Sequence, residues 1–477
     1  MKNIRTAFEY SAIYPEGLSC SKWDTVLPKK SFENLWNFIL ENSDSDMDSI
    51  MSIHSKLGKR YIKTSKYVGT IQTSDGLSIE ILPKIYDHDE SNKEPKYDAE
   101  ESRVVFLKML AALSQEKAKS FQFAEVESKK NFPILEYYIF NYIQEVEKLL
   151  SNGLKNNYTK IDENQNFLKG KLLINKQIVK NAISKEKFYV RYSKYLLNIP
   201  QNRIIKTTLN KLFLISSDLQ NRNHLKKLQL IFAEVPISKN IDLDLQQSLN
   251  GNRTFAIYNL LVKWSAQILK GKGFTPFAGE HYNQALLFSA EKLFECYIAK
   301  LFKKYARNYV TNTQHSKFYL IDRHRHENHG IFKIRPDMFL DAKDSDKSVQ
   351  GIDTQDIIID TKWKSLDEKN LRENYLIDVK DIYQLFAYGE KYGFKLHKGK
   401  TKPILILLYP CTKNFKNPLS RFDYYAEETD YGLYLYVLPF DLSEKEPQLQ
   451  IQKILDMVKE HRDFISLEDT NEYWSLH

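Results

Sequence analysis

Residues 356–364, which read DIIIDTKWK, decide the fold of this chain. Three consecutive isoleucines followed by Asp360 and Lys362 are typical of a buried β-strand that ends in ionisable side chains. Alternate side chains of a strand share a face, so Asp360 and Lys362 are expected to point one way. Thr361 and Trp363 are expected to point the other way, into a core. The stretch therefore predicts a buried strand with a chemically reactive end.

A second strand is predicted over residues 331–340, which read IFKIRPDMFL and contain Asp337, 23 positions before Asp360. Hydrolysis of a phosphodiester requires a hard divalent cation, and Mg²⁺ takes oxygen ligands from one or two carboxylates. Asp337 and Asp360 on adjacent strands would supply both, and the bound ion would polarise the phosphate and activate a water. Lys362 would orient that water and stabilise the charge that develops on the phosphate. Asp-x-Lys alone is more often a surface ion pair at a strand end, but the isoleucine run and the Pro-Asp strand favour the catalytic interpretation.

Pro-Asp, a hairpin and then Asp-x-Lys at the end of an apolar strand resemble the PD-(D/E)xK nuclease core. In residues 378–392, DVKDIYQLFAYGEKY, Gln384 and Tyr388 lie four positions apart and share one face of a predicted helix. This Q-x-x-x-Y pair is similar to the signature of one branch of these nucleases, in which the helix borders the active site. An ordinary amphipathic helix accounts for the same apolar spacing without any catalytic role. The resemblance implies that the catalytic residues are Asp337, Asp360, Lys362, Gln384 and Tyr388.

Another helix is predicted before both strands, at residues 285–302, which read ALLFSAEKLFECYIAKLF. Glu291 and Glu295 fall on one face of this helix. In the PD-(D/E)xK fold an acidic residue of the first helix often completes the metal shell, and we assign that role to Glu295 rather than Glu291. The resemblance thus implies a Mg²⁺ site, with Mn²⁺ as an alternative ion, held by Asp337, Asp360 and Glu295.

Composition limits the class of protein. A length of 477 residues predicts two or three folded units, and a net charge of +9 suits a polyanionic partner. The three cysteines lie far apart, which excludes a disulfide framework or a Cys-based zinc site and fits a reducing compartment. The first residues lack the apolar core of a signal peptide, and no apolar run approaches the length of a membrane span. We therefore expect a soluble cytoplasmic protein with no membrane partner.

Two further motifs have bland explanations. Residues 393–401, GFKLHKGKT, are superficially similar to a P-loop, but five residues separate the glycines where the motif has four. A helix is also predicted before this stretch and a strand after it, the reverse of a P-loop, so no bound nucleotide is expected. Residues 322–330, DRHRHENHG, hold His324, His326 and His329 but no evident fourth zinc ligand. We expect a polar hairpin turn there, with contact to DNA phosphates as the weaker alternative.

The upstream half of the chain changes character twice. Residues 66–85, KYVGTIQTSDGLSIEILPKI, predict a hairpin closed at Asp75-Gly76, whereas helical patterns predominate beyond residue 101. Gly271 and Gly273 interrupt the pattern before the helix of Glu295 and mark a boundary. The predicted domains are a β-rich region at 1–100, a mainly helical region at 101–275 and a nuclease domain at 276–477.

The order of these segments resembles the McrC subunits of McrBC-type modification-dependent restriction systems, including the LlaJI-like systems. The matching stretches, from about residue 60 to about residue 460, are GTIQTSDGLSIEILPKI, LKGKLLI, IPQNRIIKTTLNKL, LFECYIAKLF, IRPDMFL, IIIDTKWK and DIYQLFAYGEKY. The resemblance implies a nuclease subunit that cuts double-stranded DNA and works with an McrB-like AAA+ GTPase ring. It also implies that the N-terminal lobe docks on the ring and stimulates its GTPase. The expected fold is mixed α/β: a β-rich and helical partner-binding lobe followed by a C-terminal αβββαβ domain of the PD-(D/E)xK type.

Two alternative functions remain at this stage. One is a stand-alone PD-(D/E)xK nuclease in DNA repair or replication. The other is a non-enzymatic adaptor that uses a nuclease fold to activate a motor, although the intact set of Asp, Lys, Gln and Tyr side chains argues against it.

Overall fold

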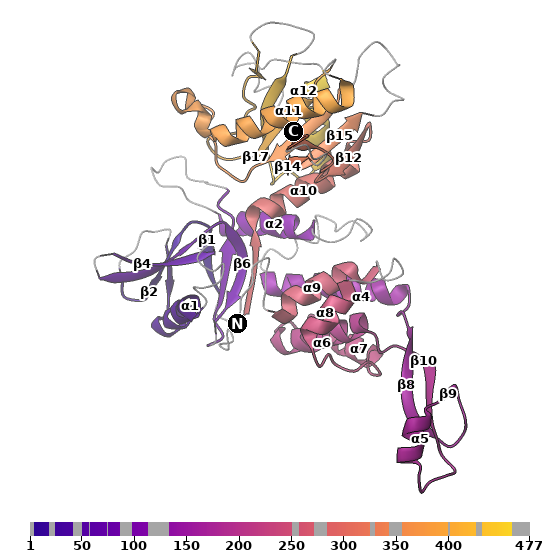
Figure 1. Ribbon diagram of the computed structural model, residues 1–477. Helices are drawn as coiled ribbons and strands as arrows, with labels where there is room; N and C mark the ends of the chain where they lie inside the picture. The colour runs from indigo at the N-terminus through magenta and orange to yellow at the C-terminus, as the bar shows by residue number, and fades with distance from the viewer. Residues whose placement is uncertain are drawn as a thin grey trace. The chain divides into compact units, whose positions relative to one another are not determined.

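The computed structural model describes residues 4–18, 24–41, 50–56, 58–73, 75–85, 98–112, 133–249, 257–270, 284–324, 330–342, 355–398, 401–425 and 432–459. Its contacts define two compact units (Figure 1). Unit 1 comprises Met1–Leu40, Asp48–Asn131 and Phe288–His477, and unit 2 comprises Glu41–Met47 and Phe132–Leu287. The N-terminal β-rich region thus belongs to the same unit as the C-terminal region, and the three-part division stays a prediction. No helix within the described ranges is long and apolar enough to cross a membrane.

The C-terminal region of unit 1 is built on a six-stranded sheet with the order β12-β15-β16-β17-β19-β18. These strands are β12 (Tyr309–Thr313), β15 (Met338–Ala342), β16 (Ile357–Thr361), β17 (Ile404–Pro410), β18 (Phe422–Asp423) and β19 (Tyr434–Phe440). β12, β15 and β16 are antiparallel neighbours, whereas β16, β17 and β19 run parallel. Every residue of β16 and β17 is buried, which explains the three consecutive isoleucines of β16 and the continuous apolar sequence of β17. The mixed α/β class expected from the sequence is confirmed.

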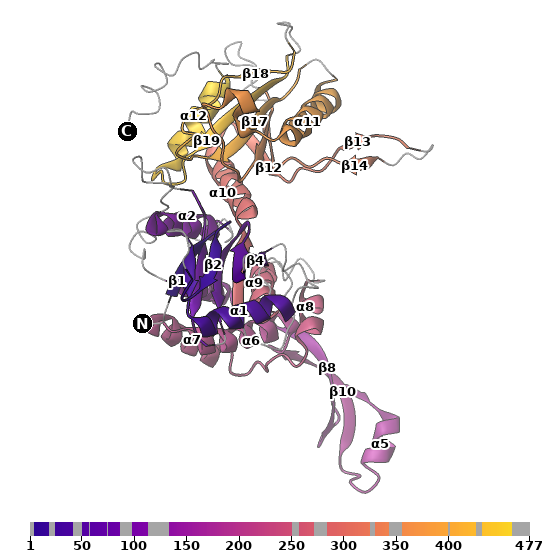
Figure 2. The same cartoon turned by 90° about the vertical axis from the view of Figure 1, so that its left-hand side faces the viewer.

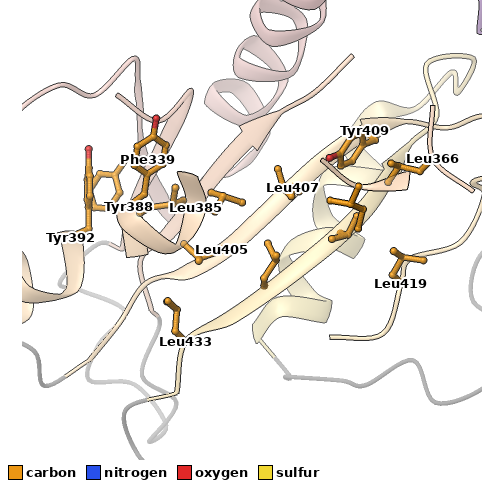
Figure 3. Packing of buried hydrophobic residues seen from close by; sticks show 14 of the residues in the cluster. Phe339, Leu366, Leu385, Tyr388, Tyr392, Leu405, Leu407, Tyr409, Leu419 and Leu433 are labelled. Atoms are coloured by element: carbon orange, nitrogen blue, oxygen red, sulfur yellow. The ribbon is translucent and has the colours of Figure 1, made fainter. Parts of the chain in front are cut away.

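Helices cover both faces of this sheet (Figure 2). α11 (Val379–His397) connects the parallel strands β16 and β17 and packs on both, while α10 (Ala290–Tyr305) and α12 (Pro447–Lys459) pack against each other. Figure 3 shows the core under α11, where Leu405 and Leu407 of β17 meet Leu385 and Tyr392 of the helix. All four side chains are fully buried, and removing a buried leucine side chain typically costs about 2–5 kcal/mol. This core fixes α11 relative to the end of β16.

Two elements differ from the expectation. Residues 331–340 do not form one strand: β14 (Ile331–Lys333) pairs with β13 (Tyr319–Ile321), and β15 begins only at Met338. Pro336 lies in the break between the two strands. Proline has no backbone N–H, so within a strand it would leave one hydrogen bond of the ladder unmade. The helix expected from residue 285 begins at Ala290, because the preceding apolar residues form β11 (Gln284–Ser289). A short apolar run suits a strand as well as a helix, so periodicity alone did not separate them.

The N-terminal region of unit 1 contains two four-stranded sheets. The first has the order β1-β7-β6-β11, with β1 (Ile4–Phe8), β6 (Tyr67–Gln72) and β7 (Ser78–Leu82). The second has the order β3-β2-β5-β4, with β2 (Ala12–Pro15), β3 (Thr25–Leu27), β4 (Met51–Lys56) and β5 (Lys59–Thr64). The predicted hairpin is confirmed as β6–β7, and Gly76 takes the positive φ of 87° that its turn requires. The described helices of this region are α1 (Lys29–Glu41) and α2 (Ala99–Ala111).

Unit 2 combines a helical bundle with a β-ribbon. The bundle contains α4 (Ile134–Ser151), α6 (Pro200–Ile215), α7 (Leu219–Ile231), α8 (Ile241–Leu249) and α9 (Asn259–Lys270). The ribbon contains β8 (Asn157–Gln165), β9 (Lys171–Leu172), β10 (Phe188–Leu196) and the short helix α5 (Ile174–Lys180). Arg203 Nη2 lies 2.5 Å from Asp244 Oδ1 and joins α6 to α8, which gives this arginine a structural role.

Candidate active site

Asp337 and Asp360 lie opposite each other at the same end of the six-stranded sheet. Met338 of β15 pairs with Ile359 of β16 in an antiparallel register. The next pair in that register is Asp337 with Asp360, and paired residues of antiparallel strands place their side chains on the same face. Asp360 is also the fourth residue of a strand that has a parallel neighbour, so it stands near a carboxyl end where open α/β sheets place their ligands.

The Asp337 carboxylate is held by the strand beside it. Its Oδ2 accepts hydrogen bonds from the backbone N–H and the hydroxyl of Thr361, both at 2.8 Å. Thr361, expected to point into a core, therefore serves the site instead. Burial raises the pKa of Asp337 to about 6, and the negative charge of Glu295 adds to the rise while the Thr361 bonds oppose it. The Thr361 hydrogen bonds thus fix the position of the Asp337 carboxylate, while burial and the Glu295 charge disfavour its ionised form.

Asp360 is the most buried acid of the site, with 2% of its surface exposed. Burial, followed by the charge of Asp337, raises its pKa to about 7. Lys362 Nζ lies 2.6 Å from Asp360 Oδ2, and this ion pair opposes the rise in the pKa of Asp360 without cancelling it.

Lys362 is surrounded by oxygen atoms from two elements. Its ammonium donates to Gln384 Oε1 at 3.1 Å and lies 3.5 Å from Asp381 Oδ1, in addition to the Asp360 contact. Burial lowers the pKa of Lys362, but the adjacent Asp360 carboxylate more than compensates, so the pKa lies above the usual range. The side chain is therefore a fixed positive charge. Lys364, two positions on, points toward Asp378 and Asp381 and is 44% exposed.

Gln384 and Tyr388 extend this arrangement along α11. Gln384 Nε2 donates to the Tyr388 hydroxyl at 2.7 Å, and that hydroxyl donates to the backbone oxygen of Arg335 at 3.3 Å. The two residues are one helical turn apart, as their spacing predicts. The Tyr388 ring belongs to the core under α11 (Figure 3), so one end of the chain of hydrogen bonds is anchored by packing. The bonds link Lys362 through Gln384 and Tyr388 to the segment that carries Asp337.

Glu295 reaches the site from α10. Its Oε1 accepts a hydrogen bond from Gln314 Nε2, and the backbone N–H of Gln314 donates to the Asp337 carbonyl at 2.8 Å. Burial raises the pKa of Glu295, Gln314 opposes the rise, and Asp360 and Glu291 add to it. Glu291 instead lies on the exposed surface, 3.8 Å from Lys66. Of the two glutamates, Glu295 is thus the one that shares the electrostatic environment of the aspartates.

Three residues near this site gave no clear signal in the sequence. Asp381 contacts Lys362 and lies three positions before Gln384, so the helical spacing of α11 could have revealed it. Gln314 has a positive φ of 50°. The neighbouring residues in the sequence form no pattern that marks it as part of the site. Glu9 accepts hydrogen bonds from Trp363 Nε1 at 3.0 and 3.1 Å and from the Lys84 backbone N–H at 2.9 Å. Trp363 also packs against Phe294, the neighbour of Glu295, with ring centroids 5.4 Å apart.

The donor set suits a hard divalent cation. Among the described residues, no three His, Cys, Asp or Glu side chains are grouped closely enough to hold a metal ion by themselves. Mg²⁺, however, commonly takes only one or two carboxylates and completes its shell with water and substrate oxygens. The Asp337 and Asp360 pair meets that need, and the raised pKa values of both carboxyl groups, which persist beside Lys362, indicate a site that favours added positive charge.

The histidine-rich stretch is only partly described. β13 and β14 form the expected hairpin, and His324 lies just beyond β13. His326 and His329 fall outside the described residues.

Comparisons with known proteins converge on one system. The model of a family described as McrBC 5-methylcytosine restriction system component matches residues 62–410. A solved structure of a half-complex from a tetradecameric assembly of Thermococcus gammatolerans McrB AAA+ hexamers with bound McrC contains a chain of similar fold, with a TM-score of 0.59 and 16% identity. That match covers 96% of this chain and 100% of the other. A cryo-EM structure of the Thermococcus gammatolerans McrBC complex matches with a TM-score of 0.44 and 18% identity, covering 64% of this chain and 88% of the other. The chain has no significant match among curated proteins.

Proposed function

We propose that this chain, which belongs to the McrBC 5-methylcytosine restriction system component family, is the DNA endonuclease subunit of a GTP-dependent restriction complex. The observation that carries the proposal is the connected set of side chains at the end of β16. Asp337 and Asp360 flank the last residue pair of β15 and β16, Lys362 contacts Asp360, and a chain of hydrogen bonds fixes Lys362 to α11. Such a concentration of buried, mutually perturbed ionisable groups is typical of a catalytic site.

The order of elements supports a PD-(D/E)xK nuclease. Among the described residues, α10, β12, β15, β16, α11 and β17 follow one another as helix, three strands, helix and strand, with the β13–β14 hairpin and a short 3-10 helix (Leu371–Leu376) between them. Pro336 and Asp337 precede β15. Asp360 and Thr361 end β16 and Lys362 follows it, and these are the positions that this core uses for its motif.

The proposed metal ligands are Asp337 and Asp360, with Glu295 as a third carboxylate nearby. A bound Mg²⁺ or Mn²⁺ would polarise the scissile phosphate and lower the pKa of an attacking water. Burial raises the pKa of Asp337 to about 6 and that of Asp360 to about 7, so the free protein retains part of a proton on these carboxyl groups near neutral pH. Cation binding must therefore release protons, and affinity is expected to fall as the pH drops below about 6 or 7.

Lys362 supplies the fixed positive charge. Its raised pKa keeps the ammonium protonated, so it acts as a hydrogen-bond donor and as a charge rather than as a base. Gln384 accepts a hydrogen bond from one of the three N–H groups of the Lys362 ammonium and so limits the rotation of the Lys362 side chain. A remaining donor would serve a phosphate oxygen or the attacking water, which stabilises the negative charge of the transition state.

Partner binding is assigned to the N-terminal lobe and to unit 2. The T. gammatolerans assembly of similar fold consists of McrB AAA+ hexamers with bound McrC, and we propose a corresponding AAA+ GTPase ring as the partner here. The ribbon of unit 2 supports docking through exposed apolar side chains on and after α5. Ile178, Val179 and Ile183 are 66%, 77% and 96% exposed. Exposed apolar side chains in such number on one small element are typical of an interaction surface.

The test separates cleavage from partner activation. Plasmid DNA is incubated with Mg²⁺, GTP, the AAA+ partner and either wild-type chain, Lys362→Ala or Lys364→Ala. We expect Lys362→Ala to abolish cleavage while stimulation of the partner GTPase stays at the wild-type level. Lys364→Ala, a matched loss of a lysine two positions away, should retain cleavage within a few-fold. Full cleavage by Lys362→Ala, or loss of GTPase stimulation by a folded Lys362→Ala chain, would overturn the assignment of two separate activities.

A further inference from the structure

The β13–β14 hairpin is the one described element that interrupts the strand order next to the candidate active site. Tyr319 pairs with Lys333 and Ile321 with Ile331, so the element is a short two-stranded antiparallel ribbon. Figure 2 shows both strands extending outward past α11. The proposed cleavage chemistry uses none of its residues. The ribbon therefore has a role other than the cleavage step itself.

The base of the ribbon is fixed firmly on α11. Lys391 Nζ donates to the Leu320 carbonyl at 3.2 Å and to Asp322 Oδ2 at 2.8 Å, and Lys395 Nζ lies 3.1 Å from the same Asp322 oxygen. The Phe318 ring meets the Tyr392 ring edge to face, with centroids 5.0 Å apart. Gln384, Tyr388, Lys391 and Lys395 follow one another at helical spacing, so the helix face that orients Lys362 also orients the ribbon.

The exposed charge of the described part of the ribbon and its base is positive. The exposed basic residues there are Lys317, Arg323, Lys333 and Arg335, whereas the described acid, Asp322, is already engaged by Lys391 and Lys395. The Lys333 ammonium lies 5.8 Å from the centroid of the Tyr319 ring, which restricts it to one side of the hairpin. Basic side chains on a rigid, outward-facing element match the phosphate backbone of a nucleic acid.

Phe332 is an exposed aromatic residue with an unfavourable backbone conformation. It is 70% exposed and has a positive φ of 56°, a backbone region that residues with bulky side chains rarely adopt. Such strain costs on the order of 1 kcal/mol or more and persists at positions where the local geometry serves a function. Leu320, opposite it in the register, is 43% exposed. The apolar pair is thus presented to solvent between the basic side chains.

We propose that the β13–β14 ribbon binds double-stranded DNA beside the scissile phosphate, an inference that rests on the proposed nuclease function. Arg323 and Lys333 contact backbone phosphates, and Phe332 packs against the sugars or base edges. The major groove admits a two-stranded ribbon of this kind. Lys333 lies four positions before Asp337, and four extended residues span at most about 14 Å. The backbone at Lys333 therefore lies within about 14 Å of Asp337, which places its phosphate contact on the duplex next to the cut.

Binding is tested without cleavage. Fluorescence anisotropy measures the Kd of the full chain for a labelled DNA duplex in EDTA over a series of salt concentrations. For Arg323→Ala/Lys333→Ala we expect Kd to rise about tenfold or more at moderate salt, and the slope of log Kd against log salt to fall by about 2, since each lost phosphate contact removes about 0.9. Lys303→Ala/Lys304→Ala, which removes the same charge at the exposed end of α10, should leave the slope unchanged.

Phe332→Asn provides the second arm. Asparagine tolerates a positive φ, so this variant should be at least as stable as the wild type and yet bind DNA several-fold more weakly. Wild-type Kd and salt slope in the ribbon double variant, or no duplex binding by the wild-type chain at low salt, would overturn the proposal. These outcomes are independent of cleavage: a chain that binds DNA through the ribbon but never cuts with Mg²⁺ refutes the nuclease function alone, and a chain that cuts without needing the ribbon refutes the ribbon alone.

Discussion

Replacing Asp360 with asparagine should make the protein more stable at neutral and alkaline pH. Asp360 is buried beside Asp337, and burial raises its pKa from an ordinary 3.8 to about 7. Between these two pH values the folded chain holds a proton that the unfolded chain releases, so the free energy of unfolding falls as the pH rises. Asparagine does not titrate, so the free energy of unfolding of Asp360→Asn does not fall with pH for this reason.

The size of the effect follows from the shift. Each pKa unit corresponds to about 1.4 kcal/mol, so a rise of about three units sets a ceiling of about 4 kcal/mol. We expect Asp360→Asn to gain about 2–4 kcal/mol over the wild type at about pH 8 and little at about pH 4, with the change complete just above pH 7. Removing the charge also lowers the pKa of Glu295, which the Asp360 carboxylate helps to raise.

Equilibrium urea unfolding in EDTA at several pH values measures the difference. Asp322→Asn is the matched control, because Lys391 and Lys395 lower the pKa of Asp322 and give its removal the opposite sign. That variant should lose stability where Asp360→Asn gains it. Added Mg²⁺ should stabilise the wild type and leave Asp360→Asn unchanged, since only a ligand that binds the folded chain raises its stability. An Asp360→Asn chain that is less stable than the wild type at about pH 8, or a difference that does not vary with pH, would refute the reasoning.

Two further substitutions test the groups around the site. Gln384→Leu removes the oxygen that accepts a hydrogen bond from Lys362. We expect kcat for cleavage to fall about 10- to 100-fold with no change in the Kd for DNA. An unchanged kcat would show that Lys362 does not need this hydrogen bond. Trp363→Phe deprives the buried Glu9 carboxylate of its Nε1 donor and should cost about 1–3 kcal/mol of stability in urea unfolding. Because burial raises the pKa of Glu9 to about 7, that cost should be larger above pH 7 than below it, and Glu9→Gln in the same chain should reduce it.

Periodicity accounts for what the sequence revealed. The strand of Asp360, the helix of Gln384 and Tyr388 and the β6–β7 hairpin all follow from local spacing, and the structure contains all three. The strand ends at Thr361, so Lys362 lies just beyond it. The family resemblance required the order of several such segments and is confirmed by the match over residues 62–410. The roles of the site residues stay predictions.

Contacts between distant segments could not be predicted in this way. Glu9 meets Trp363 across more than 350 positions, and no local pattern marks either residue as a partner of the other. Residues 331–340 were expected to form one strand because apolar residues flank Pro336 on both sides, yet the first part pairs with β13 instead. The apolar residues before Ala290 suit a strand and a helix equally, and pairing with β6 decides the outcome.

The most direct test of the account is cleavage of plasmid DNA by the wild-type and Asp360→Asn chains with Mg²⁺, in the presence and absence of the AAA+ partner and GTP. We predict cutting by the wild-type chain only when partner, GTP and Mg²⁺ are all present, and no cutting by Asp360→Asn even though it folds and stimulates the partner GTPase. Robust cutting by the wild-type chain alone would indicate a stand-alone nuclease. Cutting by Asp360→Asn would contradict the assignment of the active site.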